Sequence, residues 1–274
     1  MRTMLLGIVA VSLSVACRPL FAQAHKVVYA KDGSGVFGYK DTPVQPWSGY
    51  HVHDPDRPVP KKVDPGDPPS DRPAPPPSDA IVLFDGTGLD AWQPTQWKVE
   101  NGCLVATQGP MLTRQQFGSC QLHVEWMAPS EPARSIWDDG NNGVFLGGAV
   151  EVQIFNSYRT KIYPDGQAAA IYAQTPPLVN ACRKPGQWEV YDIVYRAPTF
   201  DAQGKLLQPA RLTMFHNGVL VHWDQEIYGG STHAALASYA GVKARAPIGL
   251  GAHHCPVRFR NIWIRPLDEV APKQ

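Results

Sequence analysis

Short segments in which apolar and polar residues alternate recur along the chain from about residue 80 to residue 265. Successive side chains of a strand point to opposite sides, so a period of two is typical of a strand with one buried face. The same region lacks an amphipathic helix of normal length, and the pattern therefore predicts an all-β protein. The expected strands are 81–84, 97–100, 103–106, 117–127, 143–146, 149–155, 188–195, 212–215, 219–223, 248–252 and 257–265.

Two Asn-Gly pairs, Asn101-Gly102 and Asn217-Gly218, separate consecutive expected strands. Asn-Gly is the strongest short-range signal for a hairpin turn. Residues 229–245 show no clear pattern and are expected to form a long loop. In the last strand, alternation places Phe259, Asn261 and Trp263 on one face and Arg258, Arg260, Ile262 and Ile264 on the other. Short strands and frequent turns favour a β-sandwich.

A proline-dense stretch covers residues 42–78. Proline fixes φ and lacks a backbone donor, so this stretch predicts an extended arm rather than a helix or a sheet. The aromatic residues of its first part, 39–53, indicate that this part lies against the domain, whereas the part after Val63 is expected to be a loose spacer. We thus expect an arm at 25–79, a sandwich domain at 80–268 and a tail at 269–274.

The first 24 residues resemble a secretory leader: Arg2 precedes an apolar run, and Ala22-Gln23-Ala24 provides a small-residue cleavage site. The apolar run is too short for a stable transmembrane helix. Lipoprotein processing at Cys17 is the alternative, but Leu13 stands one place too early for it. We expect an exported protein, either periplasmic or extracellular.

Export would leave four cysteines, Cys103, Cys120, Cys182 and Cys255. Oxidising compartments permit disulfides, so Cys103–Cys120 and Cys182–Cys255 are expected pairs. Four buried free thiols are the equally weighted alternative. A formal net charge of +1 gives no electrostatic reason to expect nucleic acid or an anionic membrane as a partner.

Polar residues enter an otherwise apolar region between Gly140 and Ala173. Glu151 and Gln153 are two residues apart, so on a strand they share a face that is opposite to Val150, Val152 and Ile154. A buried polar group without a partner costs about 1–3 kcal/mol, which argues against placing this face in a closed core. The face suits a sugar-binding cleft.

Five segments in order resemble the 3-keto-disaccharide hydrolase family: LFDGT at 83–87 with Trp92, GNNGVF at 140–145, EVQI at 151–154, the stretch 166–172, and 249–264. The resemblance covers roughly residues 80–267. It implies a concanavalin A-like jelly-roll β-sandwich with a carbohydrate cleft. It also implies substrates oxidised to a ketone at C3 of the sugar, which are cleaved by elimination or by net hydrolysis.

The resemblance also directs attention to individual residues. Glu151 and His253 are the expected catalytic residues. Relatives usually carry Gln-Asp-His-Gly where this chain has Gly251-Ala252-His253-His254, so the missing aspartate leaves the exact activity open. The expected substrate-binding residues are Asn141, Gln153, Tyr172, Asn180, Arg183 and His254. Arg258 and Arg260 are candidates for pairing with Glu151 across the sheet.

The sequence specifies no cofactor and leaves open whether a metal is required. Oxygen-rich loops hold Ca²⁺, and histidine binds transition metals, so a divalent cation would be held by Asp138, Glu151 and His253 if it is present. The turn preference of Asp and Asn explains Asp138, Asp139, Asn141 and Asn142 equally well.

The sequence thus predicts an exported hydrolase or lyase that acts on a small 3-keto-glycoside or 3-keto-disaccharide. A non-catalytic, lectin-like sugar-binding module is the alternative, because jelly rolls host both functions. An interaction protein whose proline arm binds a partner is a third interpretation.

Overall fold

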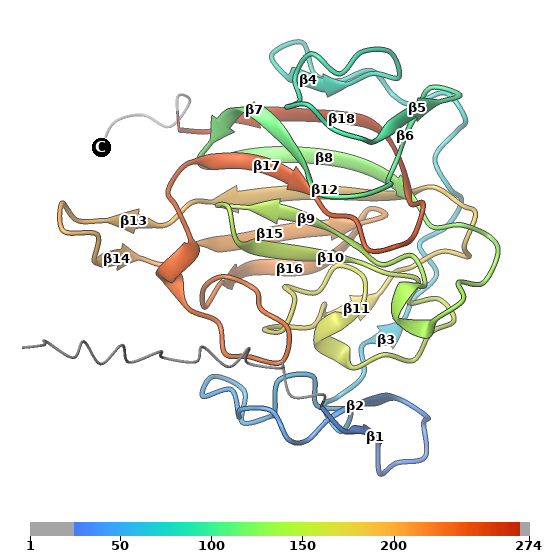
Figure 1. Cartoon of the computed structure of the whole chain (residues 1–274), viewed down its shortest axis with the longest axis vertical. Helices are drawn as coiled ribbons and strands as arrows, with labels where there is room; N and C mark the ends of the chain where they lie inside the picture. Colours follow the sequence, from blue (N-terminus) through green and yellow to red (C-terminus); the bar gives the residue numbers. More distant parts are fainter. Residues whose placement is uncertain (1–24, 269–274) are drawn as a thin grey trace, which may run out of the picture.

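The computed structural model describes residues 25–268; the expected leader, Cys17 and the tail at 269–274 lie outside these residues. Two antiparallel sheets pack face to face (Figure 1). The described part contains no α-helix, only the single-turn 3₁₀ helices η1 (Ile136–Asp138), η2 (Pro164–Gly166) and η3 (Tyr239–Gly241). The predicted jelly-roll β-sandwich is confirmed. No helix in residues 25–268 is long and apolar enough to cross a membrane.

The larger sheet has eight strands. Their order is β16 (Val219–Glu226), β15 (Arg211–His216), β12 (Glu189–Arg196), β8 (Cys120–Met127), β18 (Arg258–Pro266), β6 (Cys103–Val105) and β5 (Lys98–Glu100), with β4 (Ile81–Phe84) also paired to β18. The two predicted Asn-Gly hairpins are present. Both residues of each pair have positive φ, 52° and 71° at Asn101-Gly102 and 55° and 78° at Asn217-Gly218, as a type I′ turn requires.

The smaller sheet has the order β10 (Val150–Ile154), β9 (Asn142–Leu146), β17 (Ala246–Leu250) and β7 (Met111–Phe117). Its inner face meets the larger sheet in one apolar core. Leu122, Met214 and Phe259 from the larger sheet are fully buried there, and each such side chain contributes about 1.5–3 kcal/mol on burial.

The expected faces of the last strand are partly wrong, because this strand contains a β-bulge. The register of β18 shifts between Arg260 and Trp263, and Asn261 has a φ of 47°. The extra residue turns Ile262 and Ile264 to the core together with Phe259, while Trp263 stacks on His123 with ring centroids 4.9 Å apart. Simple alternation fails here because a bulge adds one residue to one strand.

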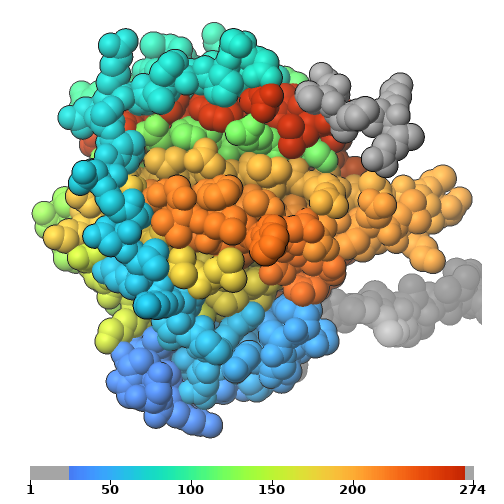
Figure 2. All heavy atoms as spheres, turned by 180° about the vertical axis from the view of Figure 1, so that it is seen from behind, coloured from blue at the N-terminus to red at the C-terminus, as the bar shows by residue number. Residues whose placement is uncertain are grey.

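The arm is ordered against the domain in both its parts. Its first part holds β1 (Val27–Tyr29) and β2 (Phe37–Tyr39), and β3 (Lys61–Lys62) pairs with β11 (Val179–Asn180). A short separate hairpin, β13 (Thr199–Phe200) with β14 (Leu206–Gln208), extends from the sandwich. Figure 2 shows the cyan segment that follows β3 running along the edge of the sandwich from the blue arm to the first domain strands.

The expectation of a loose spacer after Val63 is wrong. Arg260 donates from Nη2 to Ser70 O (2.8 Å) and from Nη1 to Asp71 O (2.9 Å), and Arg183 donates from Nη2 to Asp67 O (2.8 Å). A proline-rich backbone has carbonyls without partners of its own, and arginine supplies several donors at once. Arginine side chains of the domain therefore hold the spacer by hydrogen bonds to the backbone carbonyl groups of the spacer.

Candidate active site

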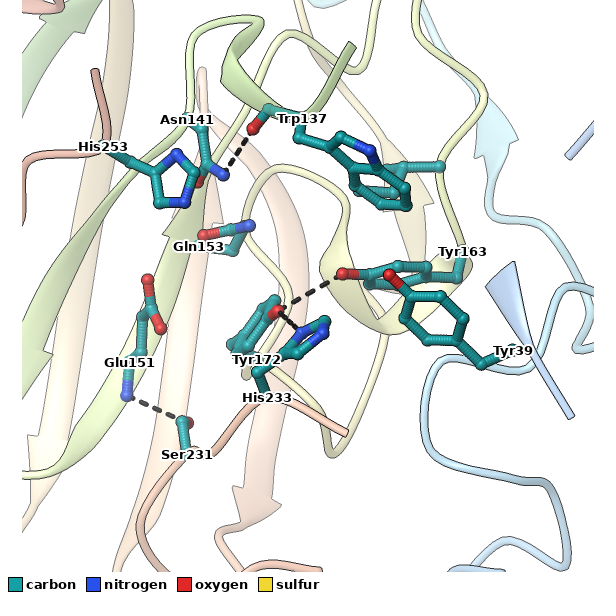
Figure 3. Close-up of a pocket in the computed structure, with 11 residues that line it drawn as sticks. Tyr39, Trp137, Asn141, Glu151, Gln153, Tyr163, Tyr172, Ser231, His233 and His253 are labelled. Atoms are coloured by element: carbon teal, nitrogen blue, oxygen red, sulfur yellow. Dashed lines mark hydrogen bonds between the residues drawn. The ribbon is translucent and has the colours of Figure 1, made fainter. Parts of the chain in front are cut away.

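A cavity of about 540 Å³ lies on the face of the smaller sheet that is turned away from the core. Figure 3 shows that its lining comes from strands of the sandwich, from loops and from the arm. Segments that are far apart in the sequence thus meet here. The lining residues are Tyr39, Trp137, Asn141, Glu151, Gln153, Ile162, Tyr163, Tyr172, Ser231, His233 and His253.

Strand β10 supplies the predicted carboxylate and amide. Val150, Val152 and Ile154 are fully buried in the core, so Glu151 and Gln153 face the cavity together, as expected. With its nitrogen toward the surrounding acceptors, the Gln153 amide donates to Asn142 O (2.8 Å) and to Glu151 Oε1 (3.2 Å). The backbone N of Glu151 donates to Ser231 Oγ (3.1 Å). The carboxylate is therefore held from its own strand, and the backbone of Glu151 is held from the loop 229–245.

Gly143 provides the space that the Glu151 carboxylate occupies. Gly143 lies opposite Gln153 on the neighbouring strand β9. A Cβ at position 143 would lie 2.3 Å from Glu151 Oε1 and 2.8 Å from Cγ. Any larger residue would have to displace the carboxylate, which explains the glycine on physical grounds.

Burial raises the pKa of Glu151 to about 8. A carboxylate loses much of its solvation in such a site, and the ionised form is disfavoured. The Gln153 donor acts in the opposite direction because it stabilises the charged form. A carboxyl group with a pKa close to the operating pH is suited to general base chemistry.

Tyr172 lies between a tyrosine and a histidine. Its hydroxyl is 3.2 Å from Tyr163 Oη and 2.9 Å from His233 Nδ1. Burial raises the pKa of both tyrosines, so each keeps its proton at neutral pH. Burial, together with the neighbouring histidines His53, His25 and His253, lowers the pKa of His233 to about 4, which leaves the imidazole neutral.

His253 lies at the rim opposite these tyrosines. Its Nδ1 is 2.9 Å from Asp138 Oδ1, and about half of the side chain is exposed (51%). Asn141 Nδ2 donates to Trp137 O (2.7 Å), which fixes the amide beside the imidazole. Figure 3 shows His253, Asn141, Gln153 and Glu151 on one side of the cavity.

Aromatic rings make up the other side (Figure 3). Tyr39 from the arm lies 6.1 Å from Trp137 and 6.0 Å from Tyr163, measured between ring centroids. Phe37 packs edge-on against Trp137 at 5.1 Å. These rings belong to a small apolar cluster, separate from the main core, that the arm and the domain build jointly.

A model of the 3-keto-alpha-glucoside-1,2-lyase-like domain matches residues 79–265. The chain belongs to this family. The resemblance to the 3-keto-disaccharide hydrolases that the motifs carry is therefore confirmed. Family membership supports a carbohydrate-related function for the chain.

Solved structures of candidate glycosyl hydrolases from Parabacteroides distasonis are similar to the chain. One is 39% identical, covers 69% of this chain and 84% of its own, and superposes with a TM-score of 0.66. Two others are 18% and 19% identical, with TM-scores of 0.51 and 0.53. Each covers 69% of this chain, and they cover 94% and 99% of their own chains. At this level of identity they show the fold alone. None of the curated proteins matches the chain significantly.

Three of the expected substrate-binding residues of this lyase-like domain lie outside the cavity. Arg183 binds spacer carbonyls, and Asn180 pairs with β3 and donates from Nδ2 to Ser157 O (2.8 Å). His254, with a φ of 51°, faces a separate depression beside Cys255. The Arg183 side chain holds the arm, the Asn180 side chain bonds to the domain backbone at Ser157, and His254 faces away from the cavity.

The expected pairing of Arg258 or Arg260 with Glu151 is also wrong. Arg260 Nε donates to Glu125 Oε2 (2.6 Å), and its guanidinium lies 4.1 Å from the ring centroid of Trp188. Both contacts are on the outer face of the larger sheet, remote from β10. Trp188 accordingly has a packing role.

The residues expected to hold a cation do not fit one well. Across residues 25–268, no three His, Cys, Asp or Glu side chains form a group that could hold a metal ion. Asp138 is paired to His253, and the neighbouring Asp139 accepts from Arg159 Nη2 (2.7 Å) and Thr160 Oγ1 (2.6 Å).

Cys103, Cys120, Cys182 and Cys255 are all buried free thiols. The expected disulfides Cys103–Cys120 and Cys182–Cys255 are absent from the described residues, and the alternative of four free thiols holds. Cys182 Sγ instead donates to Glu189 Oε1 (3.2 Å). These thiols have packing roles.

Several lining residues, among them Ser231, His233, Tyr39 and Trp137, were not singled out from the sequence. Ser231 and His233 come from the patternless loop 229–245, and Tyr39 comes from the arm. Only the aromatic content of residues 39–53, which correctly predicted contact with the domain, pointed toward Tyr39. No local signal pointed to His233.

Proposed function

We propose that this chain is an exported enzyme that cleaves 3-keto-glycosides, and that Glu151 removes the proton from C2 of the ketosugar. One observation carries this proposal: among the described residues that line the cavity, Glu151 has the only carboxylate, and its pKa is raised to about 8. Membership of the lyase-like family supports the choice of a 3-keto substrate.

The proposed reaction is an elimination followed by the addition of water. A ketone at C3 acidifies the hydrogen on C2. Glu151 takes this proton, and the C2–H electron pair forms the C2=C3 bond of an enolate with negative charge on O3. The enolate then restores C3=O, forms a C1=C2 double bond and expels the C1 oxygen with its bonding pair. Water added across C1=C2 completes a net hydrolysis.

The other polar residues have roles that follow from their positions. When His233 donates from Nδ1 to the Tyr172 oxygen, the Tyr172 hydroxyl is free to donate its own proton to the enolate oxygen. Tyr172 would then stabilise the negative charge on O3 as an oxyanion donor does. His253, which the contact of its Nδ1 with Asp138 orients, lies at the rim, where its Nε2 can hydrogen-bond to a hydroxyl group of the substrate. Gln153 keeps Glu151 directed into the cavity.

Ordinary glycosidases work differently. They flank the glycosidic bond with two carboxyl groups, one acting as acid and the other as nucleophile or base. The lining described here offers one carboxylate. A single base with a nearly neutral pKa suits proton abstraction better than an oxocarbenium mechanism.

The function is tested by incubating the mature protein with 3-keto-trehalose, 3-keto-lactose and methyl 3-keto-glucoside, each with and without EDTA. We expect a 2-hydroxy-3-keto-glycal or its hydrate, identified by mass spectrometry, and no product from the unoxidised sugars. A 3-keto-glucoside that is bound but never consumed would favour the lectin-like alternative. A loss of turnover with EDTA would assign a cation to the reaction.

Gly143→Ala tests the placement of the carboxylate. The added methyl group overlaps the present position of Glu151 Oε1, and a displacement of about 1 Å can cost about 100-fold in rate. We expect kcat/KM for a 3-keto-glucoside to fall about 10- to 100-fold without unfolding. Gly88→Ala is the matched control, since its Cβ meets nothing closer than 3.8 Å. Equal activity of the two variants would refute this role of Gly143.

A further inference from the structure

The cavity has a polar half and an aromatic half. Its polar half gathers the carboxylate, two amides and the rim histidine, which are groups that hydrogen-bond to sugar hydroxyls. Its other half contains Tyr39, Trp137, Tyr163 and Ile162, and Tyr172 and His233 lie between the two halves. If C2 of the ketosugar lies at Glu151, the leaving group on the adjacent C1 extends into the aromatic half, because this is the space that remains.

Tyr39 reaches this half from outside the family domain. The match to the lyase-like domain begins at residue 79, whereas Tyr39 ends strand β2 of the arm. Figure 3 shows its hydroxyl directed toward the cavity. Burial and the nearby Asp41 raise its pKa, so the hydroxyl remains a donor, and no hydrogen bond from residues 25–268 contributes to that shift.

The arm holds Tyr39 in place. Backbone N of Tyr39 donates to His53 O (2.8 Å), and Gly38 passes so close to this carbonyl that a Cβ there would lie 2.1 Å from it. His53 stacks on Tyr163 with ring centroids 3.9 Å apart, and Trp47 stacks on Tyr228 at 4.2 Å. These contacts fix the tyrosine as a wall of the cavity.

We propose that the arm forms the leaving-group subsite, in which Tyr39 and Trp137 select 3-keto-glycosides whose leaving group is a planar aromatic ring. A flat apolar ring can pack against the rings of Tyr39, Trp137 and Tyr163, whereas a second sugar has more hydroxyl groups than the tyrosine hydroxyls of this half can pair with. Aromatic rings also gain from offset or edge-on contact with one another. The proposal rests on the proposed function of the same site.

Tyr39→Ala tests this subsite with two substrates, 4-nitrophenyl 3-keto-glucoside and methyl 3-keto-glucoside. Each variant is compared with the wild type on the same substrate, which cancels the difference in leaving-group reactivity. We expect kcat/KM to fall about 10-fold or more on the aryl substrate and less than about 3-fold on the methyl substrate. Tyr39→Phe keeps the ring and should keep most of the aryl activity.

Tyr29→Ala is the matched control, since Tyr29 lies on the same hairpin but is 68% exposed. It should leave both substrates unaffected. Equal losses on the two substrates in Tyr39→Ala, or no loss on either, would overturn the subsite proposal while leaving the proposed function intact. If the wild type cleaves neither substrate, the proposed function is wrong and the subsite proposal falls with it.

Discussion

Glu151→Gln is expected to lower kcat for cleavage of a 3-keto-glucoside by about 10²- to 10⁴-fold, the range that general base catalysis contributes. The amide has nearly the same shape as the carboxyl group but cannot accept the C2 proton. The position of Gly143 shows that this site is fitted to a side chain of that size. Activity within about threefold of the wild type would exclude Glu151 as the base.

The pH dependence provides a second measure of the same residue. A base must be ionised to act, so kcat/KM of the wild type should rise with pH and level off above about pH 8, the raised pKa of Glu151. His233 is neutral above about pH 4 and should add no step near neutrality. The rise near pH 8 should be missing from the residual activity of Glu151→Gln.

Folding provides the control for this variant. A carboxyl group whose pKa is raised in the folded state lowers stability as pH increases from its ordinary value of 4.5 to about 8. Glutamine removes this effect. The Tm of Glu151→Gln should therefore equal that of the wild type at low pH and exceed it at pH 8, so that lost activity cannot be attributed to unfolding.

Asp165→Ala is expected to destabilise the protein by about 3–5 kcal/mol, the usual cost of removing one partner of a buried ion pair. Asp165 is fully buried. Its carboxylate accepts from His53 N (3.1 Å) and pairs with His53 Nδ1 (3.2 Å), and it lies 3.8 Å from Arg57 Nη1.

Both of these partners come from the arm. Burial alone would raise the pKa of Asp165, but His53 and Arg57 outweigh it and lower the pKa. Without the carboxylate, Arg57 stays buried with Gln45 Oε1 and Gln174 O as its remaining partners. Urea unfolding measures the loss, and the arm should become more susceptible to proteolysis.

Asp79→Ala is the control for Asp165→Ala. Asp79 accepts from Arg265 Nη2 at 2.6 Å, but its side chain is 59% exposed, and an exposed pair contributes about 0–1 kcal/mol. Equal unfolding free energies for the two variants would contradict the view that the arm docks through a buried charge. Asp165→Asn keeps the shape and should fall between them.

The sequence predicted the parts of the fold that depend on local pattern. Both Asn-Gly turns and the strand that carries Glu151 and Gln153 follow from residues close together in the chain. A period of two fixes which side chains share a face, so the polar face of β10 was predictable. The bulge at Asn261 broke the same rule in β18, because nothing in the local pattern marks an inserted residue.

The rest of the site depends on contacts between distant residues. His233 and Tyr172 are in hydrogen-bond contact although they are 61 positions apart in the sequence, and Tyr39 comes to the cavity from the N-terminal arm. Asn180 and Arg183 were misassigned because neighbours in sequence can bind different partners; here their partners are backbone groups of Ser157 and of the proline-rich spacer. Periodicity carries no information about such pairings.

Cleavage of a 3-keto-glucoside that carries deuterium at C2 tests the central claim most directly. If Glu151 abstracts the C2 proton, the deuterium is released to water, the glucose-derived product lacks it by mass spectrometry, and the rate falls relative to the protium substrate. Retention of the full label at C2 in the cleaved sugar would contradict the account, because direct hydrolysis at C1 never breaks that bond.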